Sequence, residues 1–168
     1  YIDQKQIIVD NISITIDNFA DLKILNTYEA SNLLTRQNHV ETPVLLIIAP
    51  DGDNIFTLMT PLINWKKLKG YKVFYYQLNE TGYTSSDIKA FIQNAYNNWE
   101  YPPNYICLIG DADGAYSVPT FTESLSIYNG ESDHPYTLLE GDDNISDVAV
   151  GRLSIRSLSD LATIINKI

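Results

Sequence analysis

The sequence predicts a three-layer α/β/α domain with a mostly parallel sheet, preceded by a short β-rich segment. Continuous apolar runs, which are typical of strands buried on both faces, alternate with segments whose apolar residues recur at helical spacing. Strands that alternate with helices form right-handed crossovers, so helices should cover both faces of the sheet. We therefore divide the chain into a β-rich lead-in and connector, residues 1–42, and an α/β domain, residues 43–168.

The lead-in alternates β-branched apolar residues with polar ones over residues 7–9 and 12–16, which predicts a hairpin or two edge strands. Residues 18–41 have only weak periodicity, and we expect a connector with one short helix there. The first core strand is predicted over residues 44–49, because this run is entirely apolar and ends at Pro50.

A helix is predicted next, over residues 53–69, from apolar residues at helical spacing. Pro61 should kink this helix or start its second part, because proline lacks the backbone N–H. Gly70 follows three lysines, which suits a helix C-terminus and its cap. The second strand is then expected over residues 72–76.

The second half of the domain repeats the pattern. A helix should begin near Thr84, with Ser85 or Ser86 as its N-cap. Strands are predicted over residues 105–109 and 147–153, and the first of them is a continuous apolar run. A final helix starts at about Ser157 and ends the chain.

Composition excludes several classes of partner and site. The chain has 168 residues, 45% of them hydrophobic, which is enough for one globular domain. The formal charge of -10 should repel nucleic acid and anionic membrane surfaces, and no basic cluster is large enough to overcome that repulsion. Cys107 is the single cysteine, so an internal disulfide and a multi-cysteine metal site are excluded.

Acidic residues mark the expected functional edge. In a doubly wound sheet, ligands bind beyond the carboxyl ends of the strands. We expect this edge to carry Asp51, Asp111, Asp113 and the whole irregular segment 110–147. Long irregular segments in compact domains are usually functional or disordered, so the chemistry of the domain is expected in this segment.

Two kinds of chemistry are candidates for these carboxylates. The run 109–114 resembles the nucleophile motif of haloacid dehalogenase phosphatases, but the segment after it has no room for that family's Ser/Thr and Lys. A structural calcium ion is the second candidate, because hard cations take several carboxylate oxygens. Its candidate ligands are Asp142, Asp143, Asp147 and Glu131. The structural alternative is that these carboxylates cap turns or face water.

Cysteine chemistry within this chain would require Cys107 and His134. Cys107 lies in the middle of an apolar strand, where a thiol behaves as a small core residue with a raised pKa. We therefore assign Cys107 a structural role. His134 stands between Asp133 and Pro135, where it can either face a substrate or form a hydrogen-bonded pair with the aspartate.

Five segments in order resemble the gingipain (C25) cysteine peptidase family. They are residues 61–73, residues 84–89 with 96–99, residues 105–111, residues 132–136 and residues 147–153. The likeness implies a caspase-like catalytic domain of two α/β subdomains, of which this chain is similar to the first, a flavodoxin-like half-domain. The family's catalytic histidine lies in a His-Gly motif of the second subdomain, and its cysteine follows later. Here His39 precedes Val40 and His134 precedes Pro135, so this chain alone is expected to be inactive.

The resemblance also implies a role for this half and its partners. The residues expected at the substrate cleft are Ser132, Asp133 and His134. Asp133 would favour a basic P1 side chain through a charge-assisted hydrogen bond, or alternatively cap a turn or bind calcium. The expected partners are a polypeptide substrate and the missing second subdomain, and no cofactor is required beyond the candidate calcium. Family membership implies a secreted or bacterial cell-surface protein.

Two other functions stay open at this point. The chain could be a non-catalytic binding module of the same fold, and the parent reading frame decides this, since a peptidase would continue into a His-Gly and a later cysteine. An Mg²⁺-dependent phosphatase is the other alternative, which a phosphatase assay of this chain would decide.

Overall fold

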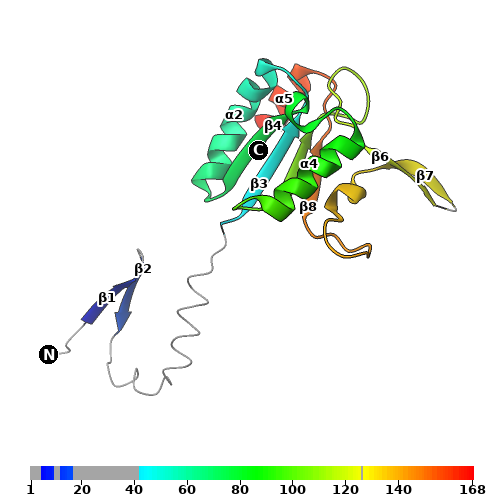
Figure 1. Cartoon of the computed structure of the whole chain (residues 1–168). Coiled ribbons are helices and arrows are strands. Elements are labelled where there is room, and N and C mark those ends of the chain that lie inside the picture. Colours follow the sequence, from blue (N-terminus) through cyan, green and yellow to red (C-terminus); the bar gives the residue numbers. More distant parts are fainter. Residues whose placement is uncertain (1–4, 10–11, 17–41, 126) are drawn as a thin grey trace. The chain divides into compact units, whose positions relative to one another are not determined.

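The structure is a computed structural model that describes residues 5–9, 12–16, 42–125 and 127–168. The chain divides into two compact units, Tyr1–Glu41 and Thr42–Ile168. In the first unit, β1 (Lys5–Val9) and β2 (Ile12–Ile16) pair antiparallel, which confirms the predicted hairpin (Figure 1). The connector and the short helix predicted within residues 18–41 lie outside the described residues.

A four-stranded parallel sheet forms the centre of the second unit. Its strands are β3 (Val44–Ala49), β4 (Lys72–Gln77), β5 (Tyr105–Ile109) and β8 (Ala149–Leu153), in the order β4-β3-β5-β8. Every neighbouring pair is parallel, so the crossover connections predicted from the sequence are present. The predicted fold class is confirmed. All strands start at one edge of the sheet, the amino edge, and end at the opposite one, the carboxyl edge.

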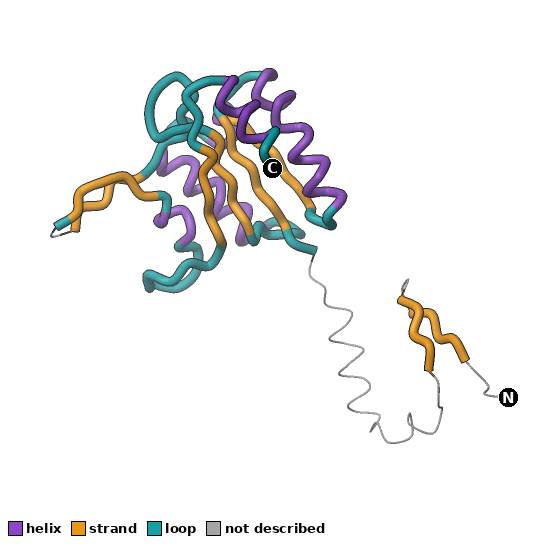
Figure 2. Tube along the Cα trace, turned by 180° about the vertical axis from the view of Figure 1, so that it is seen from behind, coloured by secondary structure: helices purple, strands orange, loops and turns teal. Residues whose placement is uncertain are grey.

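Helices cover both faces of this sheet (Figures 1 and 2). On one face, α2 (Asp53–Leu68) and α5 (Leu158–Ile165) pack on Leu45 and Ile47 of β3. On the other face, α4 (Ser85–Asn98) packs on Leu46 and Ile48. Every residue of β3 is buried, which explains why this strand is a continuous apolar run. Within the described chain, no helix is long and apolar enough to span a bilayer.

The helices differ from the sequence predictions in three respects. Thr84, rather than Ser85 or Ser86, is the N-cap of α4, because its hydroxyl accepts a hydrogen bond from the amide of Asp87 and the Asp87 carboxylate reciprocates. This capping box needs an acidic residue three positions after the cap, which only Thr84 has. α2 runs as one helix through Pro61. A short helix, α3 (Leu78–Thr81), follows β4 and was not predicted.

The segment after β5 contains elements that the sequence did not predict. β6 (Phe121–Leu125) and β7 (Tyr128–Ser132) form an antiparallel hairpin, and a 3-10 helix, η2 (His134–Thr137), follows it. The two strands pair only with each other, and Figure 1 shows the hairpin projecting away from the main sheet. A hairpin that is not part of a core lacks the apolar alternation by which strands are recognised.

Candidate functional site

The site begins at a tight loop after β5. Gly110 has φ 133°, and a Cβ at this position would lie 2.5 Å from the carbonyl oxygen of Tyr116. Glycine is therefore required for this approach of the two backbone segments. The loop closes on itself, because the amide of Asp111 donates to Tyr116 O at 3.0 Å and that of Val118 donates to Asp111 O at 2.9 Å.

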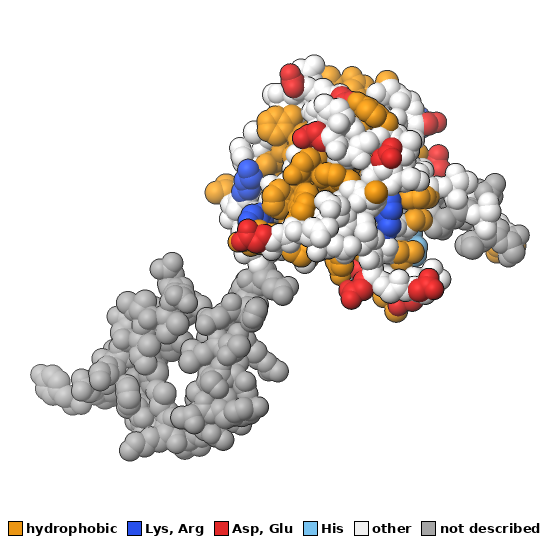
Figure 3. Space-filling model, in the orientation of Figure 1, with side chains coloured by type: hydrophobic (Ala, Val, Ile, Leu, Met, Phe, Trp, Pro, Cys, Tyr) orange, Lys and Arg blue, Asp and Glu red, His pale blue; other side chains and the backbone are white. Residues whose placement is uncertain are grey.

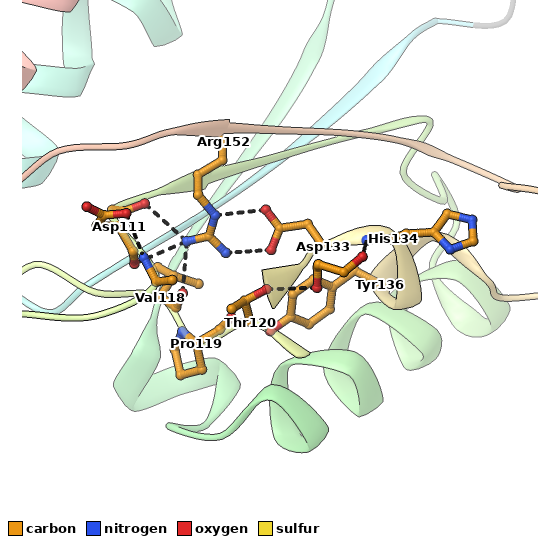
Figure 4. A network of polar contacts seen from close by, with 11 residues as sticks. Asp111, Val118, Pro119, Thr120, Asp133, His134, Tyr136 and Arg152 are labelled. Carbon is orange, nitrogen blue, oxygen red and sulfur yellow. Dashed lines mark hydrogen bonds and ion pairs between the residues drawn. The ribbon is translucent and has the colours of Figure 1, made fainter. Parts of the chain in front are cut away.

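Arg152 of β8 ties this loop to the hairpin. Its Nη1 donates to the carbonyl oxygens of Gly110, Asp111 and Val118 at 3.1, 3.2 and 2.8 Å. Its Nε and Nη2 donate to the two carboxylate oxygens of Asp133 at 2.8 and 2.7 Å (Figure 4). The Arg152 and Asp133 side chains are only 12% and 21% exposed. The ion pair and the three Nη1 hydrogen bonds together link three separate segments at the carboxyl edge.

Tyr136 of η2 also holds the loop after β5 and the hairpin in place. It is fully buried, its hydroxyl donates to the carbonyl oxygen of Pro119 at 2.6 Å, and its ring packs edge-on against Phe121. Burial, and secondarily the charge of Asp133, raises the pKa of Tyr136 above its usual value. Thr120 adds a hydrogen bond from its hydroxyl to Ser132 O at 2.7 Å. The end of the loop is thus fastened to the start of η2.

A pocket of about 210 Å³ lies over these contacts. It is lined by Asp111, Ala112, Thr120, Glu131, Ser132, Asp133, Arg152 and Ser154. These residues lie at or just after the ends of β5 and β8, or in and beside the hairpin, so the pocket lies at the carboxyl edge, where ligands bind in such sheets. Arg156 donates from Nε to Asp111 Oδ2 at 3.1 Å, and this bond lowers the pKa of the Asp111 carboxyl. Two carboxylates of the pocket therefore already have arginine partners.

The predicted cleft residues lie in different settings. Ser132 and Asp133 line the pocket. His134 does not line it, and its imidazole points away from Arg152 in Figure 4. The backbone amide of His134 donates to the Ser132 hydroxyl at 3.2 Å, so the described contact of this residue is made by its backbone.

The predicted calcium ligands do not come together. Asp147 Oδ2 accepts hydrogen bonds from the amides of Leu139 and Glu140 at 2.7 and 2.8 Å, and Asp143 accepts one from Ile145 at 2.8 Å. The candidate ligand Glu131 lines the pocket instead. Among the residues that the structure describes, no group of three or more His, Cys, Asp or Glu side chains could hold a metal ion. Calcium binding by Asp142, Asp143, Asp147 and Glu131 stays a prediction.

The position of the acidic loop, residues 138–147, corrects one prediction. We expected the whole segment 110–147 at the carboxyl edge, but the loop leads into β8, which is parallel to β5, and so lies toward the amino edge. Contacts with α4 hold it there, since Lys89 Nζ donates to Leu138 O and Gln93 Nε2 donates to Leu139 O at 2.8 Å. Two consecutive parallel strands force their connection to cross the length of the sheet.

Cys107 is remote from this pocket in both contacts and chemistry. Cys107 packs in the apolar cluster on the face of the sheet that α2 and α5 cover. Tyr136, which lies two residues after His134, packs in the cluster on the opposite face, under α4. Burial raises the pKa of the Cys107 thiol to about 11. A thiol in this state has little thiolate at neutral pH and is a poor nucleophile.

Sequence reasoning missed the residue at the centre of the site, Arg152. The signal was present, because an arginine within a predicted core strand must find an acidic partner. The partner could not be chosen from the sequence alone, since the segment before β8 contains many carboxylates.

A domain of this fold with a polar pocket at the carboxyl edge belongs, by sequence, to a known class of enzymes. The chain is a member of peptidase family C25, whose sequence profile matches residues 38–168.

Among individual proteins, it is 28% identical over 140 residues to Lys-gingipain of Porphyromonas gingivalis. That match covers 76% of this chain and 7% of Lys-gingipain. A solved protease structure has a TM-score of 0.64 and 25% identity, over 79% of this chain and 30% of that one. The crystal structure of the Arg-specific cysteine proteinase gingipain R has a TM-score of 0.62 and 22% identity, over 76% of this chain and 28% of that one, which shows a common fold.

Proposed function

We propose that this chain is the first, non-nucleophilic subdomain of a gingipain-like cysteine endopeptidase and forms one wall of its substrate cleft. The observation that carries the proposal is the pocket at the carboxyl edge, built around Arg152 and Asp133 in a chain of family C25. Lys-gingipain and gingipain R are much longer than this chain, so the rest of the catalytic machinery would come from a second subdomain. The substrate would be a polypeptide.

The contribution of the pocket would be positional and electrostatic. Arg152 holds Asp133 with both nitrogens of its fork, and this fixes the start of η2 against the loop after β5. Substrate-positioning groups act by holding the scissile bond in a productive geometry. A pocket wall held by five hydrogen bonds from one arginine meets this requirement of rigidity.

The Arg152–Asp133 geometry limits how Asp133 could favour a basic P1 side chain. An ionised carboxylate has about four lone-pair sites, and Arg152 occupies one on each oxygen of Asp133. A substrate Arg or Lys could use the remaining sites without displacing Arg152. Matched Arg, Lys and Ala substrates supplied to the complete enzyme test the idea, and equal kcat/KM for all three would reject it.

Filling the pocket tests the cleft proposal itself. Ser154 is an exposed residue of the pocket and takes no part in the hydrogen bonds of Arg152, so Ser154→Tyr should obstruct the pocket and leave its framework intact. In the complete enzyme we expect at least a tenfold rise in KM for a peptide substrate, about 1.4 kcal/mol. Asn64→Tyr, at an exposed position of α2, is the matched control. Equal kinetics for the two variants would contradict the proposal.

The binding-module alternative differs in one observable. The observable is labelling of the parent protein by an electrophilic probe for cysteine peptidases. If this chain is a peptidase subdomain, the probe should label the parent protein outside this chain. If it is a binding module, the probe should not label the parent protein. Secretion or a bacterial cell-surface location is part of the peptidase proposal. Fractionation of the producing cells, followed by immunodetection of this chain, tests that location.

A further inference from the structure

An apolar groove lies between α2 and α5, on the opposite side of the sheet from α4. It has a volume of about 210 Å³ and is lined by Pro61, Leu62, Trp65, Ile165 and Ile168. Trp65 is 37% exposed, and Pro61, one helical turn before it, is exposed as well. Large apolar side chains that remain exposed together around a groove are typical of a surface that binds another molecule.

Lysine side chains surround the tryptophan of this groove. The ammonium groups of Lys66 and Lys69 lie 5.0 and 4.3 Å from the centre of the Trp65 ring, and Lys66 also lies 4.9 Å from the ring of Tyr71. In the described parts of the chain, Lys66 and Lys69 form no ion pair with a carboxylate. Their charges are held over aromatic faces, which leaves their N–H groups available to an anion.

This lysine–tryptophan surface, Lys66 and Lys69 around Trp65, contrasts with the rest of the unit. Four of the eight Lys and Arg residues within 42–168 fall between Lys66 and Lys72. The unit has fifteen Asp and Glu residues, and none falls in that interval. In Figure 3, blue side chains lie at the left with one red side chain directly beside them, and red ones gather at the lower right, over the acidic loop. The surface is therefore a local positive region on an acidic protein.

We propose that the groove and the lysine–tryptophan surface together dock an acidic segment of a separate polypeptide. An apolar side chain of that segment would enter the groove beside Leu62, and its carboxylates would bind Lys66 and Lys69. A peptide fits better than a nucleic acid or a sulfated polysaccharide, because the chain's charge of -10 repels densely charged polymers but tolerates a few carboxylates. This site is independent of the pocket at the carboxyl edge and of the proposed peptidase role.

Peptide binding to the whole chain tests the proposal. The probe is a short peptide with two leucines flanked by glutamates, and its counterpart has lysines in place of the glutamates. We expect saturable binding of the acidic peptide, seen as a change in tryptophan fluorescence and by calorimetry, that weakens as salt is added. We expect no binding of the basic peptide. Failure of the acidic peptide to bind, or equal binding of both, would overturn the proposal.

Charge reversal locates the site. Lys69→Glu should weaken binding of the acidic peptide at least tenfold, because it removes the cation nearest Trp65. Lys67→Glu is the matched control, since it makes the same charge change beside Lys66 at an exposed lysine that is not one of the two stacked on Trp65, and it should change the affinity less than about threefold. Lys69→Gln, with an unchanged circular dichroism spectrum, separates loss of the contact from loss of folding. Equal effects of Lys67→Glu and Lys69→Glu would contradict the site, as would a sulfated polysaccharide that binds at Lys69 when the peptide does not.

Discussion

The two edges of the sheet use positive charge in opposite ways. At the carboxyl edge, Arg152 is mostly buried and every described contact of its guanidinium is with the protein's own oxygens. At the amino edge, Lys69 is exposed and its ammonium lies over Trp65. A buried charge must be satisfied internally, while an exposed one can be kept for a partner. The first region is therefore built for rigidity and the second for binding.

Removing Arg152 should lower the free energy of unfolding much more than removing Lys69. Arg152→Ala leaves the Asp133 carboxylate and three carbonyl oxygens without this partner, and we expect a loss of about 3–5 kcal/mol in the free energy of unfolding. Lys69→Ala removes an exposed cation–π contact and should cost about 1 kcal/mol or less. Urea denaturation of both variants measures the difference. Similar losses for the two would contradict the contrast.

Strand β5, in the interior of the sheet, carries the only cysteine of the chain. The reactivity of this thiol gives a chemical test of core burial. A rise in the pKa of Cys107 from 9.0 to about 11 lowers the thiolate fraction at pH 8 about 100-fold. We expect a thiol reagent to label the folded chain at least that much more slowly than the chain in guanidinium. Rapid labelling of the folded chain would place Cys107 in a reactive setting and reopen its catalytic role.

Tyr136 should show how much of the rigidity at the carboxyl edge depends on hydrogen bonds below the pocket. Tyr136→Phe keeps the ring on Phe121 but leaves the carbonyl oxygen of Pro119 without its donor, which should cost about 1–3 kcal/mol. Tyr83→Phe removes a hydroxyl that donates to Asp51 at an exposed site and should have a smaller effect. Thermal unfolding of both variants checks this order, and a larger effect of Tyr83→Phe would reverse it.

The smallest effect concerns the acid stability of the acidic loop, residues 138–147, which lies toward the amino edge. Backbone amides of Leu139 and Glu140 lower the pKa of Asp147 in the folded state. A lowered folded pKa gives stability that is present above the unfolded pKa and is lost as pH falls through the folded pKa. The free energy of unfolding of Asp147→Asn should therefore decrease less steeply than that of the unmodified chain as the pH falls below about 4. Asp142→Asn, at an exposed carboxylate of the same loop, is the control, and an equal flattening would contradict the assignment.

The sheet and its helices could be predicted from the sequence, whereas most of the site could not. Apolar runs such as 44–49 report burial on two faces, and this signal is local. The β6–β7 hairpin joins neighbouring segments that lack the apolar alternation of a core strand, and the Arg152–Asp133 pair joins residues 19 positions apart, so neither has a local signal in the sequence. The position of the acidic loop could have been deduced, because a parallel β8 requires the residues before it to return to the amino edge.

The most direct test of the account compares the complete protein with this chain. Each is incubated with an electrophilic active-site probe for cysteine peptidases and with a fluorogenic peptide substrate. We predict that the complete protein is labelled outside Tyr1–Ile168 and cleaves the peptide, and that this chain is neither labelled at Cys107 nor active. Hydrolysis by this chain together with labelling of Cys107 would contradict the central claim that it is the non-nucleophilic half of the enzyme.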